Sequence, residues 1–82
     1  IMTISDAIIK RINNLKKEKH IENPYQLALK SGLDESVIRS VLNGRSKYPN
    51  THTIFFIAYG LNMTLSEFYN DSLFDIDNID ET

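Results

Sequence analysis

The sequence predicts an all-α domain built from five short helices. Apolar residues recur at the spacings of three and four that gather them on one helix face, as with Ile8, Ile12 and Leu15. Ser, Thr, Asn or Asp precedes each apolar segment, and these are the residue types that cap helix starts. A chain of 82 residues forms one small domain with a single modest core.

The first helix is expected over residues Ser5–Lys19, with Thr3 or Ser5 as its cap. Lys10, Lys16 and Lys17 lie on its other faces. A solvated charged face is the simplest interpretation of these lysines.

Residues Asn23–Gly44 predict two short helices joined by a tight turn at Gly32. Asn23 is expected to cap the first of them, with Pro24 at the first helical position, and Asp34 to cap the second. Two helices that cross steeply through a glycine turn form a helix-turn-helix unit, whose second helix can enter a DNA major groove. The residues expected to face the core are Leu27, Ala28, Leu33, Ile38 and Val41.

Two further helices are expected after the basic loop that follows Gly44. Asn50 or Thr51 is expected to cap the fourth helix, and Thr64 with Glu67 has the spacing of a capping box at the start of the fifth. Their core-facing residues are expected to be Ile54, Ile57, Ala58, Leu61, Leu65 and Phe68.

The chain divides into a domain over residues 1–70 and an acidic C-terminal tail over residues 71–82. Acidic residues alternate with apolar ones in this tail. One interpretation is a frayed terminus. The other is that Phe74 and Ile76 pack on the aromatic residues of the fourth helix, in the same chain or in a second copy.

The net charge of −2 hides a strong asymmetry along the sequence. All nine basic residues lie between Lys10 and Lys47, where only four acidic residues occur, which leaves +5. From Glu67 onward there are six acidic residues and no basic one. A local basic surface, rather than the total charge, is what meets the phosphates of a nucleic acid.

Composition argues against several other classes of protein. There is no cysteine, the two histidines lack metal-site spacing, and neither a His–carboxylate constellation nor a Gly-rich phosphate loop occurs. We therefore expect no enzymatic activity, no cofactor and no metal. No apolar run approaches the ~20 residues of a membrane span and no secretory leader is evident, so we expect a cytoplasmic protein.

Several residues in register resemble the Cro and repressor family of phage proteins, also called the xenobiotic-response-element (XRE) family. In the helix pair they are Leu27-Ala28, Gly32-Leu33, Ile38, Ser40 and Gly44, followed by a basic loop and Pro49; downstream they are Thr53-Ile54, Ile57-Ala58, Leu61, Met63, Leu65 and Phe68. The resemblance covers roughly residues 8 to 70. It implies a five-helix, lambda-repressor-like domain with its helix-turn-helix in helices 2 and 3. The implied function is a sequence-specific regulator of transcription, in the first instance a repressor, that binds double-stranded DNA as a homodimer on a two-fold operator.

The resemblance also implies roles for individual residues. The residues expected to contact bases are Glu35, Ser36, Val37, Arg39 and Ser40. The residues expected to contact phosphates are Lys16, Lys17, Tyr25, Gln26, Asn43, Arg45, Ser46 and Lys47. Glu35 can accept from cytosine N4, Arg39 can donate to guanine O6 and N7, and Val37 can touch a thymine methyl group. The alternatives are that Glu35 and Arg39 form an i, i+4 surface ion pair, and that the basic loop is simply solvated.

Two departures from the family weaken the expected contacts. Pro24 stands where the family often has a glutamine that contacts phosphate, and proline has no comparable donor. Asp34 and Glu35 place two acidic residues at the end of the helix that would face DNA. We therefore expect modest affinity that depends strongly on salt.

Phe56, Tyr59 and Phe74 are the expected dimer interface, because surface aromatic residues commonly mark contacts between proteins. The same residues support an alternative function. In that alternative the chain is a protein-interaction module, such as an antitoxin or a regulator, that binds a partner protein through the fourth helix and the tail.

Overall fold

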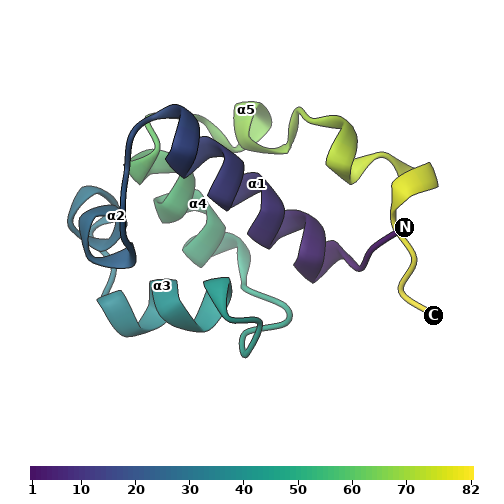
Figure 1. The fold of residues 1–82 in the computed structure, drawn as a ribbon, viewed down its shortest axis with the longest axis horizontal. Coiled ribbons are helices and arrows are strands. Elements are labelled where there is room, and N and C mark those ends of the chain that lie inside the picture. The colour runs from purple at the N-terminus through teal and green to yellow at the C-terminus, as the bar shows by residue number, and fades with distance from the viewer.

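The computed structural model describes all 82 residues and contains five α-helices and no β-strand (Figure 1). The predicted all-α class and the number of helices are therefore confirmed. None of these helices combines the length and the apolarity that crossing a membrane requires. The helices are α1 (Ile4–Glu18), α2 (Pro24–Ser31), α3 (Glu35–Leu42), α4 (Thr51–Gly60) and α5 (Leu65–Tyr69), followed by the 3-10 turns η1 (Ser72–Phe74) and η2 (Ile76–Asn78).

Most helix starts are capped by the residues that the sequence predicted. Asn23 Oδ1 accepts from the Gln26 N–H at 2.9 Å at the start of α2. Thr64 and Glu67 form the predicted capping box of α5, and these hydrogen bonds lower the pKa of the Glu67 carboxyl. Thr3, one of the two predicted candidates, caps α1. These caps form because a short polar side chain supplies the acceptor that the first helical N–H groups lack.

The prediction that Asp34 caps α3 is correct in position but wrong in chemistry. Asp34 occupies the N-cap position, yet its carboxylate makes no hydrogen bond to the helix. The Val37 N–H, which such a cap would use, donates instead to the main-chain carbonyl of Asp34 at 3.0 Å. A main-chain carbonyl thus accepts the N–H at the start of α3 that a side-chain cap would have bound, and the carboxylate of Asp34 stays in solvent.

One face of every helix packs into a single core. All the residues expected to face inward are buried, except Leu33 and Leu65, which are half-buried and pack against the same cluster. In Figure 1, α1 passes in front of α4, with α3 below and α5 above. Gly32, with φ of +74°, provides the left-handed residue that ends α2 and turns the chain into α3.

Helices α2 and α4 approach each other closely at Gly60 and Ser31. A Cβ atom at Gly60 would lie 2.8 Å from the backbone nitrogen of Ser31 and 2.9 Å from its Cα. Ser31 is fully buried, and its hydroxyl is satisfied locally because it donates to the Ala28 carbonyl and accepts from the Leu33 N–H. Two small residues therefore set the distance between the two helices.

The acidic tail is ordered rather than frayed. The Met2 N–H donates to the Asn78 carbonyl at 3.0 Å, and the Asp80 N–H donates to the Met2 carbonyl at 2.9 Å. This short parallel bridge between Met2 and Ile79 brings the two ends of the chain together, as Figure 1 shows. The Glu81 carboxylate also accepts from the Ile4 N–H.

Phe74 packs on α5 within this chain, not on the aromatic residues of α4 as the second interpretation of the tail expected. Its ring centroid lies 6.2 Å from that of Phe68 and 5.0 Å from that of Tyr69. Desolvation among these rings raises the pKa of Tyr69. Ile76 is 89% exposed, so it contributes no packing inside the chain.

Arg11 of α1 fastens α5 and the tail to the rest of the domain. Its Nε donates to the Phe68 carbonyl at 2.7 Å and its Nη2 to the Glu67 carbonyl at 2.9 Å. Its Nη1 forms an ion pair with Asp71 at 3.1 Å. The side chain of Arg11 is only 11% exposed, so its contacts to the Phe68 carbonyl and to Asp71 are partly shielded from water, where they are stronger and costly to break.

Gly60→Ala is expected to lower the free energy of unfolding by about 1–3 kcal/mol, because the new methyl group would overlap the backbone of Ser31. This loss exceeds the gain in helix propensity of roughly 0.5–1 kcal/mol that alanine brings. Urea denaturation would measure it. Ser66→Ala, at an exposed position of α5, is the control and should change stability by less than about 0.5 kcal/mol. An unchanged urea midpoint for Gly60→Ala would contradict this prediction, because it would show that α2 and α4 can move apart without loss of stability.

Arg11→Met keeps the length of the side chain but removes all three polar contacts, and is expected to cost about 2–4 kcal/mol of stability. Thermal unfolding would measure the loss. Amide exchange of Leu73 and Phe74 should quicken, since the tail loses its anchor. Lys10→Met, at the neighbouring exposed position, removes the same charge without those contacts and should leave both measurements near the original values.

Candidate functional site

The outward face of α3 is polar and is not covered by the rest of the chain. Ile38 and Val41 point into the core. Ser36, Arg39 and Asn43, at the end of the helix, are exposed to solvent. The half-buried residues Glu35, Val37 and Ser40 border this face. All five residues predicted to contact bases therefore lie on α3 and outside its buried stripe.

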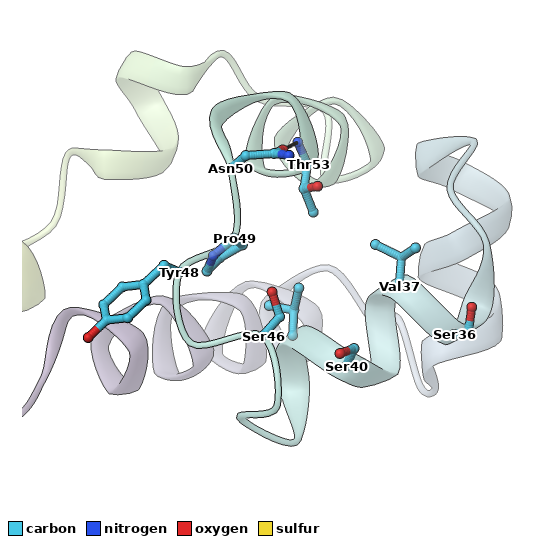
Figure 2. A pocket seen from close by; sticks show the side chains of 9 residues that line it. Ser36, Val37, Ser40, Ser46, Tyr48, Pro49, Asn50 and Thr53 are labelled. Carbon is cyan, nitrogen blue, oxygen red and sulfur yellow. Dashed lines mark hydrogen bonds between the residues drawn. The ribbon is translucent and has the colours of Figure 1, made fainter.

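An open groove of about 420 Å³ runs along the α4 side of this face (Figure 2). In Figure 2, Val37 points from α3 toward Asn50 and Thr53 at the start of α4. The Ser46 N–H donates to the Ser40 carbonyl at 3.0 Å, which folds the loop back against α3. The groove is lined by Ser36, Val37, Ser40, Val41, Ser46, Tyr48, Pro49, Asn50 and Thr53. Three predicted base-contacting residues and one predicted phosphate-contacting residue thus share one surface.

The opposite side of the same face carries an ion pair. Nε and Nη2 of Arg39 both bind Oε2 of Glu35, as the alternative interpretation of these two residues expected. Beyond Glu35, a hollow of about 350 Å³ between α2 and α3 is lined in part by Tyr25, Leu29 and Asp34. Tyr25, predicted to contact phosphate, thus lines the same hollow as Glu35.

The loop after α3 carries two exposed cations, Arg45 and Lys47. Asn43 Oδ1 accepts from the Arg45 N–H at 3.0 Å, and Gly44 turns the chain with φ of +81°. These contacts hold the loop at the end of α3.

Lys16, Lys17 and Gln26 are not brought to the groove. The two lysines line a separate hollow of about 390 Å³ at the end of α1, together with His20 and Glu22. Gln26 Oε1 accepts from the Glu22 N–H at 2.7 Å, one residue before the helix cap, so its carbonyl is used within the chain. The predicted phosphate contacts thus do not gather at a single site.

Sequence reasoning missed Asn50 and Thr53 as groove residues. It identified Asn50 only as a candidate helix cap, which it is, since its Oδ1 accepts from the Thr53 N–H at 2.8 Å. The available sequence signal was the run of short polar residues around Pro49, in the loop that leads from α3 into α4. The positions of Asn50 and Thr53 across the groove from Ser40 depend on tertiary packing, which the sequence does not display.

The outer face of α4 carries a row of aromatic rings, which we define as His52, Phe55, Phe56 and Tyr59. Neighbouring ring centroids lie 4.8 Å apart for His52 and Phe56, 5.1 Å for Phe55 and Phe56, and 6.4 Å for Phe56 and Tyr59. Phe55 is 47% exposed and Tyr59 is 64% exposed. The buried residues of α4 lie on its other side, so this helix is apolar on both faces.

Comparison with known proteins adds no relative: no protein-family model matches the chain, and neither a curated protein nor a solved structure matches it. The function must therefore be argued from the residues themselves. No group of three or more His, Asp or Glu side chains with the spacing of a metal site is present.

Proposed function

We propose that this chain binds duplex DNA through a helix-turn-helix formed by α2 and α3, and that it regulates transcription, in the first instance as a repressor. The observation that carries the proposal is the uncovered outward face of α3, with an open groove of about 420 Å³ lined mainly by short polar side chains on one side and an exposed ion pair on the other. A helix with such an exposed polar face is suited to lie in a major groove, where its side chains meet base edges. In this proposal the domain has the lambda-repressor-like arrangement.

The charge distribution supports the same proposal. The nine basic residues all belong to the part of the chain that includes α1, α2, α3 and the following loop, and the excess acidic charge belongs to α5 and the tail. Phosphate contacts supply affinity without sequence preference, whereas base contacts supply the preference. Arg45, Ser46 and Lys47 are suited to the first role and Ser36, Val37 and Ser40 to the second.

The proposed active form is a homodimer that pairs the aromatic row of α4 with the same row in a second copy. A helix that is apolar on both faces is normally buried on both, and this chain covers only one face of α4. Two-fold pairing would present two α3 helices to half-sites about one helical turn (~34 Å) apart. Phe74 packs inside the chain, so it is better suited to support α5 than to form the interface.

The aromatic row also favours a second candidate, in which the chain is an antitoxin or regulator that grips a different protein. Aromatic residues are enriched in interfaces of both kinds. Co-purification with the products of neighbouring genes would separate the two. A stoichiometric protein partner that covers α4 would support this candidate, and a self-association equilibrium without such a partner would support the homodimer.

Selection of bound sites from random duplex DNA tests the main proposal directly. We expect an enriched motif with two-fold symmetry and half-sites one helical turn apart. The same experiment reports the operator, its symmetry and its spacing. Failure to enrich any sequence, together with no binding to duplex DNA at low salt, would reject the proposal.

Lys47→Ala is expected to weaken binding to every DNA sequence and to lower the slope of log K against log [salt] by about 1, because one phosphate contact is lost. A fluorescence titration at several salt concentrations measures both effects. Lys10→Ala, on the exposed face of α1, removes the same charge and is the control. A loss confined to one sequence would contradict the phosphate role of Lys47.

Tyr59→Asp is expected to dissociate the dimer, because it places a charge at the exposed end of the aromatic row. Tyr59 is 64% exposed, so the fold itself should survive the change. Analytical ultracentrifugation would show a shift from two chains to one chain of 9.5 kDa, and binding to a two-fold operator should weaken. Ser66→Asp, exposed on α5, is the control. If the unmodified protein sediments as a monomer at the highest soluble concentrations, the dimer is wrong.

A further inference from the structure

We propose that Glu35 and Arg39 act as one recognition unit that selects a single G·C base pair in one orientation. The inference rests on the proposed function, because it requires α3 to lie in a major groove. It goes further by naming a base pair that the binding site should contain, and by assigning that pair to two residues jointly rather than to either alone.

The geometry of the ion pair leaves two groups free for a ligand. Nε and Nη2 of Arg39 both bind the same carboxylate oxygen, Oε2 of Glu35, with Nη2 at 2.5 Å. The other carboxylate oxygen, Oε1, and the other terminal nitrogen, Nη1, form no hydrogen bond within the chain. Nη2 also retains a second N–H, since a guanidinium nitrogen of this type carries two. The unit therefore presents two donors beside one acceptor.

This pair is placed for contact with a ligand rather than for stability. Its side chains are 59% exposed for Arg39 and 34% exposed for Glu35. Exposed i, i+4 ion pairs stabilise a helix by only about 0.3–0.5 kcal/mol. The contact nevertheless fixes the relative position of the two charged groups, so that a donor edge and an acceptor are presented to one ligand at once.

The order of these groups matches one base pair. In the major groove a G·C pair presents two acceptors, guanine N7 and O6, followed by one donor, cytosine N4. Two donors of Arg39 followed by Oε1 of Glu35 complement that order. An A·T pair presents an acceptor, a donor and an acceptor, and so leaves two like-with-like contacts, donor against donor and acceptor against acceptor. A C·G pair presents the same groups as G·C in the reverse order, which excludes it as well.

The pairing also accounts for an acidic residue on a surface proposed to meet DNA. A lone carboxylate on α3 would be repelled by the phosphates. Arg39 cancels that charge, so Glu35 can approach a base edge as a neutral pair. Arg39 in turn is held away from the phosphates, which a free arginine would otherwise contact without regard to sequence.

The experiment measures dissociation constants for the selected site and for the three other base pairs at each of its positions. With the unmodified protein, one G·C position should show a loss of about 5–150-fold for every replacement, the range expected for one bidentate base contact. Arg39→Ala and Glu35→Ala should each remove the discrimination at that same position. The double variant should lose no more discrimination than the worse single variant, because the residues act together. Lys30→Ala, on the exposed face of α2, is the charge-matched control and should keep the preference.

Arg39→Lys provides a second test that a folding defect cannot explain. It keeps the charge but loses the planar fork, so the preference at the G·C position should fall while the salt slope stays unchanged. If the two single variants relax different positions, or relax none, or the joint position selects A·T, this inference is wrong while duplex binding and the proposed function stand. If no duplex is bound at all, the proposed function itself has failed.

Discussion

The contact between α2 and α4 is the constraint on which the remaining arrangement depends. Gly60 lacks a Cβ where Ser31 backbone atoms would lie within 3 Å of one, so the two helix backbones sit closer than larger side chains would allow. Ser31 can be buried there because its hydroxyl is satisfied locally, by the Ala28 carbonyl in α2 and the Leu33 N–H in the turn that follows. Because α2 packs on α4 and Gly32 fixes the turn after α2, helix α3 runs across the outer edge of the core. Its polar face is left in solvent for that reason.

The two sides of that polar face differ in chemistry. Toward α4 the surface is made of hydroxyl and amide groups around an apolar Val37. Toward α2 it carries a neutralised pair of full charges, with Tyr25 beyond it. Hydroxyl groups adapt to donors and acceptors alike, whereas a fixed donor and acceptor pair does not. In the proposed complex with DNA, the adaptable side and the fixed pair would lie on opposite sides of one short helix, and the rotation of α3 in the major groove would decide which side meets which base step.

Local chemistry explains what could be predicted from sequence. Asn23 and Thr64 were identified as caps because a cap depends on three or four neighbouring residues, and the buried stripes of α1 and α4 follow from helical periodicity. The missing Asp34 cap was not predictable, because a backbone carbonyl binds the N–H that the cap would have bound.

Whether the tail is ordered could not be decided from sequence either. Its order comes from Met2 and Arg11, which lie more than 55 residues away in sequence, and distant pairings leave little trace in a local pattern. The placing of Thr53 across the groove from Ser40 also depends on a distant pairing. The roles assigned to α3 remain predictions.

The Arg11 contacts have a consequence for how the molecule assembles. Helix α5 has five residues, too few to persist alone, and two of its carbonyls depend on a guanidinium 56 and 57 positions earlier in the chain. Closing so long a loop is slow compared with forming the neighbouring contacts of α2 with α3. The C-terminal quarter should therefore join last, after α1 to α4 have collapsed around Leu27 and Ile57. A nascent chain would acquire its polar α3 surface before its acidic end is in place.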